Sequence, residues 1–130
     1  MHLLQNNLPN KLDAVHAISS LYGLYGRKNR LPYSVSKHAL EASIKCLSLE
    51  YPETQFMGYR PGFFKTKLTS ANLTKEMQDE LSKKISKKRF GTPLEISKVL
   101  LNNIRATNPY QTGTFITIDG GMISGGIFDS

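Results

Sequence analysis

The sequence alternates short apolar runs, which are typical of buried strands, with longer segments that have helical periodicity. Residues 13–20 and 54–59 predict two strands, and the β-branched residues 112–118 predict a third. Residues 33–51 contain neither glycine nor proline, so they predict a long helix between the first two strands. Such alternation is typical of α/β proteins built on a parallel sheet.

The helix predicted over residues 33–51 carries an apolar stripe that we expect to face the core. Its members recur at steps of three and four, and they are Val35, Ala39, Ala42, Cys46 and Leu49. Pro52 ends the helix. Cys46 is the only cysteine, which excludes an internal disulfide, and its position on this stripe indicates a small core residue.

Two more helices are predicted before the last strand. Asn72 is the expected cap of the first, whose narrow apolar stripe consists of Leu73, Met77, Leu81 and Ile85. Thr92-Pro93-Leu94-Glu95 predicts a capping box at the start of the second, which we expect to end at Asn108-Pro109. Three strands are few for a parallel sheet, so we expect part of the fold to lie outside this sequence.

Charge and composition limit the classes of partner. The chain has 17 basic and 10 acidic residues, a net charge of +7, but the excess is concentrated at Arg27, Lys28 and Arg30 and in residues 83–89. No aromatic residues are interleaved with these charges, so nucleic-acid binding is not predicted. No apolar run approaches the length of about 20 residues that a membrane span needs. With one cysteine and no signal peptide, we expect a cytoplasmic protein.

The three histidines, His2, His16 and His38, are not spaced as a metal site, and we expect no metal. His16 alternates within a predicted strand and His38 follows Lys37 on the predicted helix, so we interpret both as structural.

Tyr33 and Lys37 are the residues that most directly predict chemistry. They are four positions apart, which places both side chains on one face at the start of the helix. A nearby ammonium group favours the phenolate, which makes a tyrosine usable as a general acid or base. Ser20 lies thirteen residues earlier at the end of a strand, where its hydroxyl would hydrogen-bond a substrate carbonyl. The structural alternative is that Ser19 and Ser20 only end the strand.

Five segments in this order resemble the short-chain dehydrogenase/reductase family, and together they cover residues 13–122. They are Ile18-Ser19-Ser20 followed by Gly23 and Gly26 (the serine loop), Tyr33-Ser-Val-Ser-Lys37-His-Ala39 (YxxSKxA), Pro61-Gly62-Phe63-Phe64-Lys65-Thr66 (PGxxxT), Arg89-Phe90-Gly91-Thr92-Pro93-Leu94-Glu95 (RxGxPxE), and Thr112-Gly113 through Asp119-Gly120-Gly121-Met122 (TGxxxxxDGG). The resemblance implies the C-terminal portion of a Rossmann-type doubly wound parallel sheet, with about three strands and flanking helices.

The resemblance also implies an NAD(P)-dependent oxidoreductase that acts on a small-molecule carbonyl or alcohol, with catalytic residues Ser20, Tyr33 and Lys37. Ser20 would polarise the carbonyl, Tyr33 would transfer the proton, and Lys37 would hold the nicotinamide ribose. The residues implied to contact the cofactor, NAD or NADP, are Tyr33, Lys37, Pro61, Gly62, Phe64 and Thr66. The segment that contains residues 83–89 would form a mobile lid over the substrate. Its lysines would form a solvated polar face, and the alternative is that they attract an anionic substrate. The helix over residues 33–51 would form a homo-oligomer interface.

The sequence departs from the family because no glycine-rich phosphate-binding turn occurs in its 130 residues. We therefore expect one partial domain over residues 1–130, with a remnant helix or linker at 1–12, the matching segments at 13–122 and a tail at 123–130. The expected function is that of a truncated short-chain oxidoreductase. The alternative is a non-catalytic remnant that acts as an oligomerising or interaction protein.

Overall fold

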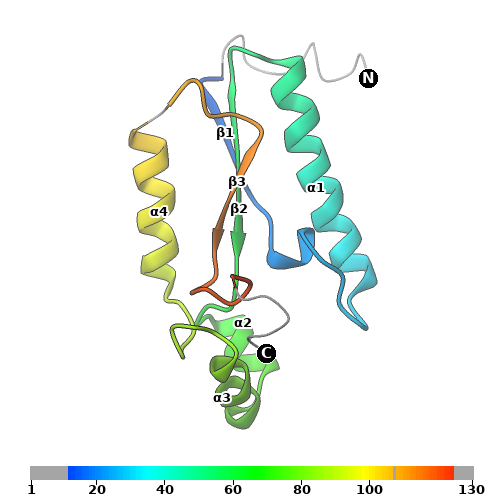
Figure 1. The fold of residues 1–130 in the computed structure, drawn as a ribbon, viewed down its shortest axis with the longest axis vertical. Helices are drawn as coiled ribbons and strands as arrows, with labels where there is room; N and C mark the ends of the chain where they lie inside the picture. The colour runs from blue at the N-terminus through cyan, green and yellow to red at the C-terminus, as the bar shows by residue number, and fades with distance from the viewer. Residues whose placement is uncertain (1–11, 107, 125–130) are drawn as a thin grey trace. The chain divides into compact units, whose positions relative to one another are not determined.

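The computed structural model describes residues 12–106 and 108–124 of the chain (Figure 1). Its elements, in chain order, are β1 (Ala14–Ile18), the 3₁₀ turn η1 (Leu21–Gly23), α1 (Leu31–Glu50), β2 (Gln55–Pro61), α2 (Lys67–Asn72), α3 (Lys75–Lys83), α4 (Pro93–Arg105) and β3 (Thr114–Ile118). The predicted alternation is confirmed, with one additional short helix, α2. The remnant predicted at residues 1–12 lies outside the described residues except for Leu12, as does the tail predicted at 123–130 beyond residue 124.

The three strands form one parallel sheet in the order β1-β2-β3. β1 pairs with β2 in parallel, from Ala14 opposite Gln55 to Ile18 opposite Tyr59. The hydrogen bonds that flank β3 connect Gly113 to Phe56 and Gly62 to Ile118, so β3 also runs parallel to β2. The predicted class, about three parallel strands with flanking helices, is confirmed. The central strand is β2, whose first five residues are buried, as expected for a strand that is paired on both edges.

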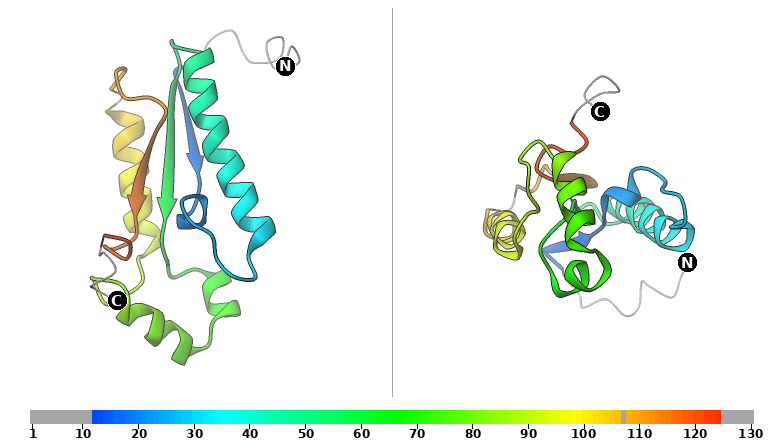
Figure 2. Two further views of the ribbon diagram at one scale, coloured as in Figure 1. Left: turned by 45° about the vertical axis from the view of Figure 1, so that its right-hand side comes forward. Right: turned by 90° about the horizontal axis from the view of Figure 1, so that it is seen from below.

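The chain divides into two compact units. Unit 1 comprises Met1–Tyr59 and Asn108–Ile116, and unit 2 comprises Arg60–Thr107 and Thr117–Ser130. In unit 1, the buried apolar side chains are Leu21, Ile44, Phe56, Met57 and Tyr59. Gly58 allows the ring of Phe115 to lie directly on β2, because an added Cβ would overlap with that ring. Figures 1 and 2 show α1 lying alongside β1, with η1 beside the first turns of the helix.

The prediction that the apolar stripe of α1 faces the core is wrong. The stripe residues, Val35, Ala39, Ala42, Cys46 and Leu49, are exposed, and Leu49 has 83% of its surface accessible. The interpretation of Cys46 as a core residue is therefore also wrong. The buried face of α1 instead carries Ser34, Glu41 and Ile44. Periodicity located a helix with two distinct faces, but the more apolar face is not the one that packs inside unit 1.

The predicted structural role of both described histidines agrees with their contacts. His16 Nδ1 lies 2.8 Å from the hydroxyl of Tyr59, and the two rings stack. His38 Nδ1 lies 2.9 Å from the carbonyl oxygen of Ser34, one turn earlier in α1. Burial lowers the pKa of His16 below its ordinary value, which favours the neutral ring.

In unit 2, the helix predicted after an Asn72 cap is α3, which begins at Lys75 instead, and the additional helix α2 precedes it. Asn72 is the last residue of α2, and α3 is capped by Thr74, whose hydroxyl accepts from the backbone N–H of Met77 at 3.3 Å. Thr66 caps α2 by accepting from the N–H of Thr69 at 3.1 Å. Asn, Thr and Ser are all good caps, so this sequence offered two neighbouring starts, and Thr74 provides the one that α3 uses.

The capping box predicted at Thr92-Pro93-Leu94-Glu95 is confirmed. α4 begins at Pro93, and Glu95 Oε2 accepts from the backbone N–H of Thr92 at 2.7 Å. Arg89 forms a bidentate ion pair with the same carboxylate, at 2.6 Å to Oε1 and 3.0 Å to Oε2. These contacts lower the pKa of Glu95 to about 2, chiefly through the hydrogen bonds from Arg89.

Candidate functional site

Ser20 lies at the carboxyl end of β1, where the chain leaves the sheet. Its backbone is extended (φ −163°, ψ 165°), and it caps η1 by accepting from the N–H of Tyr22 at 3.2 Å. The preceding residue, Ser19, donates its backbone N–H to the carbonyl of Tyr59 at 2.7 Å, which extends the pairing of β1 with β2 by one residue. Ser20 is thus the first residue beyond the sheet, at the strand end where parallel sheets gather functional groups.

Tyr33 is the third residue of α1, and 44% of its surface is exposed. Its ring meets the ring of Tyr22 edge to face, with the centroids 5.9 Å apart. Among the described residues, no group hydrogen-bonds the phenolic oxygen of Tyr33. The hydroxyl is therefore available to a small molecule, while the aromatic contact with η1 restricts the position of the ring.

Lys37 lies one helical turn after Tyr33 and connects the helix to the end of β1. Its Nζ donates to the carbonyl oxygen of Ile18 at 3.0 Å and lies 5.7 Å from the centre of the Tyr33 ring. An ammonium group has three donors, and the contact with Ile18 uses one. Lys37 thus places a positive charge beside the phenol and retains donors for a ligand.

These contacts relate the three predicted catalytic residues to one another within unit 1. Tyr33 and Lys37 lie side by side, as their spacing predicts. Ser20 caps the turn whose Tyr22 packs on Tyr33. That the hydroxyls of Ser20 and Tyr33 open onto a common cavity stays a prediction.

Glu41 is a buried acid that the sequence reasoning did not identify as part of this region. The hydroxyl of Ser19 donates to Glu41 Oε1 at 2.8 Å, and both residues are buried. Gly23 packs so closely on this pair that an added Cβ would lie 2.5 Å from Glu41 Oε1. Glu41 lies four residues after Lys37, just as Lys37 lies four residues after Tyr33. This spacing is the sequence signal that could have placed Glu41 on the same face of the helix. It ties the turn that carries Ser20 to the helix that carries Tyr33.

In unit 2, four of the predicted cofactor-contacting residues lie at the end of β2 and on the segment that follows it. Pro61 ends the strand, and Gly62 lies so close to the residue after β3 that an added Cβ would be 2.8 Å from Asp119 Cα. The backbone of Phe64 bridges to Gly91, and its ring packs over that glycine. The hydroxyl of Thr66 contacts Thr69 as the cap of α2, so in this structure it serves the helix.

Across residues 12–106 and 108–124, no cluster of three or more His, Cys, Asp or Glu side chains could hold a metal ion. Of the helices in that part of the chain, none combines the length and apolar character needed to cross a membrane.

Comparison with known proteins identifies relatives for this arrangement. The family model described as enoyl-(acyl carrier protein) reductase matches residues 2–123. The 3-oxoacyl-(acyl-carrier-protein) reductase FabG of Buchnera aphidicola subsp. Baizongia pistaciae is 34% identical over 122 residues, which are 92% of this chain and 49% of the relative. The chain thus spans about half the length of the curated relatives it matches.

Two solved structures agree with the fold. A 4-hydroxyisoleucine dehydrogenase mutant complexed with NADH and succinate matches with a TM-score of 0.80 and 27% identity, over 86% of this chain and 47% of the other. A short-chain dehydrogenase/reductase from Brucella melitensis matches with a TM-score of 0.77 and 30% identity, over 84% of this chain and 44% of the other. With nearly the whole chain matched by the family model, this protein belongs to the short-chain dehydrogenase/reductase family of oxidoreductases.

Proposed function

We propose that this chain carries the catalytic residues of an NAD(P)-dependent oxidoreductase that interconverts a carbonyl compound and an alcohol. The observation that carries the proposal is the position of Lys37, whose ammonium contacts both the end of β1 and the ring of Tyr33. An accessible phenol beside a fixed positive charge is suited to general acid–base catalysis. Membership of the family supports the same reading.

In this proposal each residue of unit 1 has a separate task. Ser20 donates a hydrogen bond to the carbonyl oxygen of the substrate. Tyr33 gives its proton to that oxygen, and the Lys37 ammonium stabilises the phenolate that remains. Glu41 acts through Ser19 to position the turn that carries Ser20.

After its bond to Ile18, the Lys37 ammonium has two N–H groups left to donate to a ligand. These two donors suit the ribose of a nicotinamide cofactor. When bound, NAD(H) or NADP(H) supplies or accepts the hydride. By the family resemblance, Tyr33 and Lys37 would hold the ribose, and Pro61, Gly62, Phe64 and Thr66 would contact the nicotinamide end. Relatives of similar identity are described with NADH and with NADP, so the proposal covers both.

We expect residues 1–130 by themselves to bind the dinucleotide weakly. Pyrophosphate is normally held by backbone N–H groups at a helix N-terminus after a glycine-rich turn, and this sequence contains no such turn. Each loss of 1.4 kcal/mol of binding free energy costs about tenfold in affinity. Saturable but weak binding and no measurable turnover are therefore expected, whereas tight binding of NADH or NADPH would contradict this expectation.

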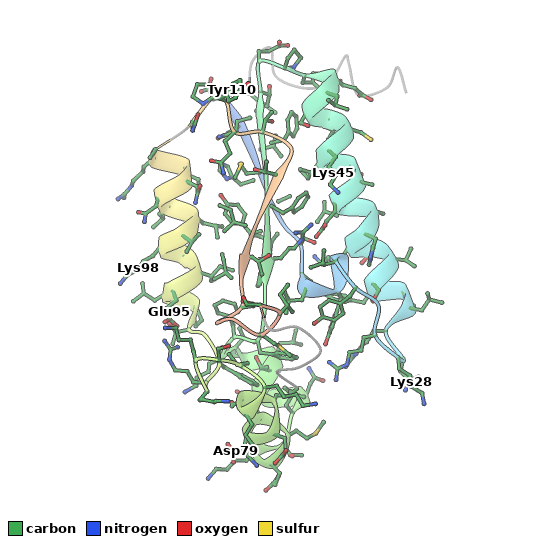
Figure 3. All side chains as sticks on the ribbon, in the orientation of Figure 1. Lys28, Lys45, Asp79, Glu95, Lys98 and Tyr110 are labelled. Carbon is green, nitrogen blue, oxygen red and sulfur yellow. The ribbon has the colours of Figure 1, made fainter. Side chains whose placement is uncertain are left out.

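Titration with NADH and NADPH, followed by NMR, tests the site. We expect the largest shifts at Tyr33 and Lys37, and we expect Lys37→Met to abolish the saturable response. The matched control is Lys45→Met, at a residue two turns along the same helix that is labelled in Figure 3. The Lys45 ammonium lies over the Phe115 ring. Equal binding by the two variants would show that Lys37 does not hold the cofactor.

A chimera tests the catalytic role of Tyr33. The glycine-rich half of a matching relative would be joined before residue 2, and oxidation of NADH or NADPH would be followed with a panel of carbonyl compounds. In an active chimera, we expect Tyr33→Phe to lower kcat by about a hundredfold or more with little change in KM. Tyr51→Phe, at the other end of α1, is the control. Unchanged kcat in Tyr33→Phe would remove Tyr33 from the reaction.

We also propose that α1 mediates self-association, because its apolar stripe is exposed. Leu31, Val35 and Leu49 have 73%, 57% and 83% of their surfaces exposed. A second copy of the same helix would cover this stripe isologously. This surface also favours the second candidate function, in which the chain is a non-catalytic interaction protein.

Light scattering and nucleotide titration together separate the two functions. We expect Val35→Lys and Leu49→Lys to convert an oligomer into a monomer, while Tyr110→Lys, at a loop residue that is 99% exposed, leaves the mass unchanged. A monomeric parent chain would contradict the interface. An oligomer without Lys37-dependent nucleotide binding would favour the non-catalytic function.

A further inference from the structure

Unit 2 contains a hollow of about 410 Å³ whose walls are basic. Five cationic side chains line it, and they are Lys65, Lys75, Lys83, Lys88 and Arg89. The only acidic residue among the lining residues is Asp79 on α3, which is labelled in Figure 3. The lining also includes Ser82 and Gln78, whose polar groups suit a hydrophilic ligand.

Three of these cations form no ion pair with any residue that the structure describes. Lys83 pairs with Glu80, and Arg89 pairs with Glu95, and neither glutamate lines the hollow. Among the described residues, no carboxylate pairs with Lys65, Lys75 or Lys88. Three unpaired lysines therefore face one lining carboxylate, Asp79, which leaves the hollow with an excess of positive charge.

The arrangement is not the ordinary solvated face of a lysine-rich helix. The lining lysines come from three separate segments: the turn after β2, α3, and the loop before α4. Lys84 and Lys87 belong to the same basic run as Lys83 and Lys88, but they do not line the hollow. Lys88 has a positive φ of 53°, and its Nζ donates to the carbonyl oxygen of Lys83 at 2.8 Å. Tertiary structure therefore selects which lysines meet here.

One wall of the hollow is an anchored aromatic residue. Phe90 is only 3% exposed, and its ring stacks on Phe63 with the centroids 5.4 Å apart. The next residue, Gly91, forms the backbone bridge to Phe64. The hollow thus combines a buried apolar wall with exposed, charged ones, and its volume falls in the range of sites for small molecules.

We propose that this basic hollow binds a small dianion, either a dicarboxylate or a phosphate monoester. Two or three unpaired ammonium groups match the charge of a dianion and provide several donors to its oxygens. A monoanion would leave most of the local charge unneutralised. The site is defined by unit 2 alone, so it does not depend on the oxidoreductase function proposed for the residues of unit 1.

NMR titration of the chain with sodium succinate, inorganic phosphate and sodium acetate at constant ionic strength tests the proposal. We expect saturable shifts at Phe90 and Gly91 with succinate, with phosphate or with both, and at least about fivefold weaker binding of acetate. Tighter binding of succinate would identify the ligand as a dicarboxylate, and tighter binding of phosphate would identify it as a phosphate monoester. No saturation with either dianion, or equal binding of acetate, would overturn the proposal.

Charge-removing variants locate the site. We expect Lys65→Gln and Lys75→Gln each to weaken binding of the better dianion by about fivefold, because each loses a charge-assisted hydrogen bond. Both side chains are exposed, and circular dichroism would verify that each variant remains folded. Lys84→Gln removes the same charge from outside the hollow and should change the affinity by less than about twofold. Equal weakening by Lys84→Gln would show only general attraction to a basic surface.

Discussion

Helices α1 and α3 obtain their stability in opposite ways. α1 has no side-chain cap and no acidic residue in its first turn, but it buries Ser34, Glu41 and Ile44. α3 buries none of its residues, yet it has the Thr74 cap, Glu76 in its first turn and Lys83 in its last. The longer helix therefore depends on distant parts of the chain, and the shorter one on signals within its own sequence.

The two helices also carry different kinds of functional group. Tyr33 and Lys37 stand on the helix that is held by tertiary contacts, so their positions are fixed relative to the end of β1. The lysines of the basic hollow stand on and around the locally stabilised helix. Fixed positions suit the proton transfer proposed for Tyr33, which requires close geometry, whereas exposed lysines suit the anion binding proposed for the hollow.

The largest expected effect comes from removing the single buried apolar side chain of α1. Ile44 is 2% exposed, so Ile44→Ala should lower the free energy of unfolding by about 2–5 kcal/mol. Met77→Ala, at a residue of α3 that is 49% exposed, should cost less than about 1 kcal/mol. Urea unfolding measures both changes in the free energy of unfolding. Equal losses in the two variants would contradict the inference that α1 depends on buried contacts and α3 does not.

Amide hydrogen exchange should show the same contrast without mutation. We expect the central amides of α1 to exchange at least about a hundredfold more slowly than those of α3, because α3 can open without exposing buried side chains. The basic segment 70–89 should be the least protected helical region. Equal protection of α3 and α1 would contradict both the comparison and the mobile lid that the family resemblance implies.

Removing the cap of α3 should produce a smaller change. Thr74→Ala loses the hydrogen bond to the N–H of Met77, and a cap of this kind is worth about 1 kcal/mol. Ser43→Ala in α1 is the control, since its hydroxyl bonds only to the carbonyl of Ala39 within the helix, and it should change stability by less than about 0.5 kcal/mol. A larger loss of stability in Ser43→Ala than in Thr74→Ala would show that hydrogen bonds within the helix contribute more to the stability of α1 than we infer.

The smallest effect is confined to acidic pH. Because Arg89 and Thr92 lower the pKa of Glu95 from 4.5 to about 2, the ionised carboxylate stabilises the folded state above pH 4.5. That contribution is lost as the pH falls from 4.5 towards 2. Unfolding at a series of pH values should show a weaker pH dependence in Glu95→Gln than in the parent, while Glu53→Gln, at an exposed residue of unit 1, leaves the slope unchanged.

Local sequence signals predicted most of the elements. The three strands lie where β-branched and apolar runs placed them, and α4 begins at the expected capping box. The four-residue spacing of Tyr33 and Lys37 correctly placed their side chains together. Each of these features depends on residues that are close in sequence.

Features that depend on distant contacts were not predictable in this way. The periodicity of α1 could not reveal that Glu41 and Ile44 face the core of unit 1 while Val35 and Leu49 face outward, because both faces repeat with the same period. The basic hollow likewise brings together residues that are distant in sequence. Lys65, Lys75 and Lys88 all line it, although each is ten or more residues from the next. Its walls are assembled by the turns around α3 rather than by any one motif.

The outward position of Cys46 gives the chain a natural attachment point for a probe. It is the only thiol in the sequence, and it lies on the exposed stripe of α1. A fluorophore or spin label would therefore attach at one defined place without any engineered cysteine. If two copies pair through this stripe, labels on the two helices would approach each other, and a distance measurement between them would report the geometry of the pair directly.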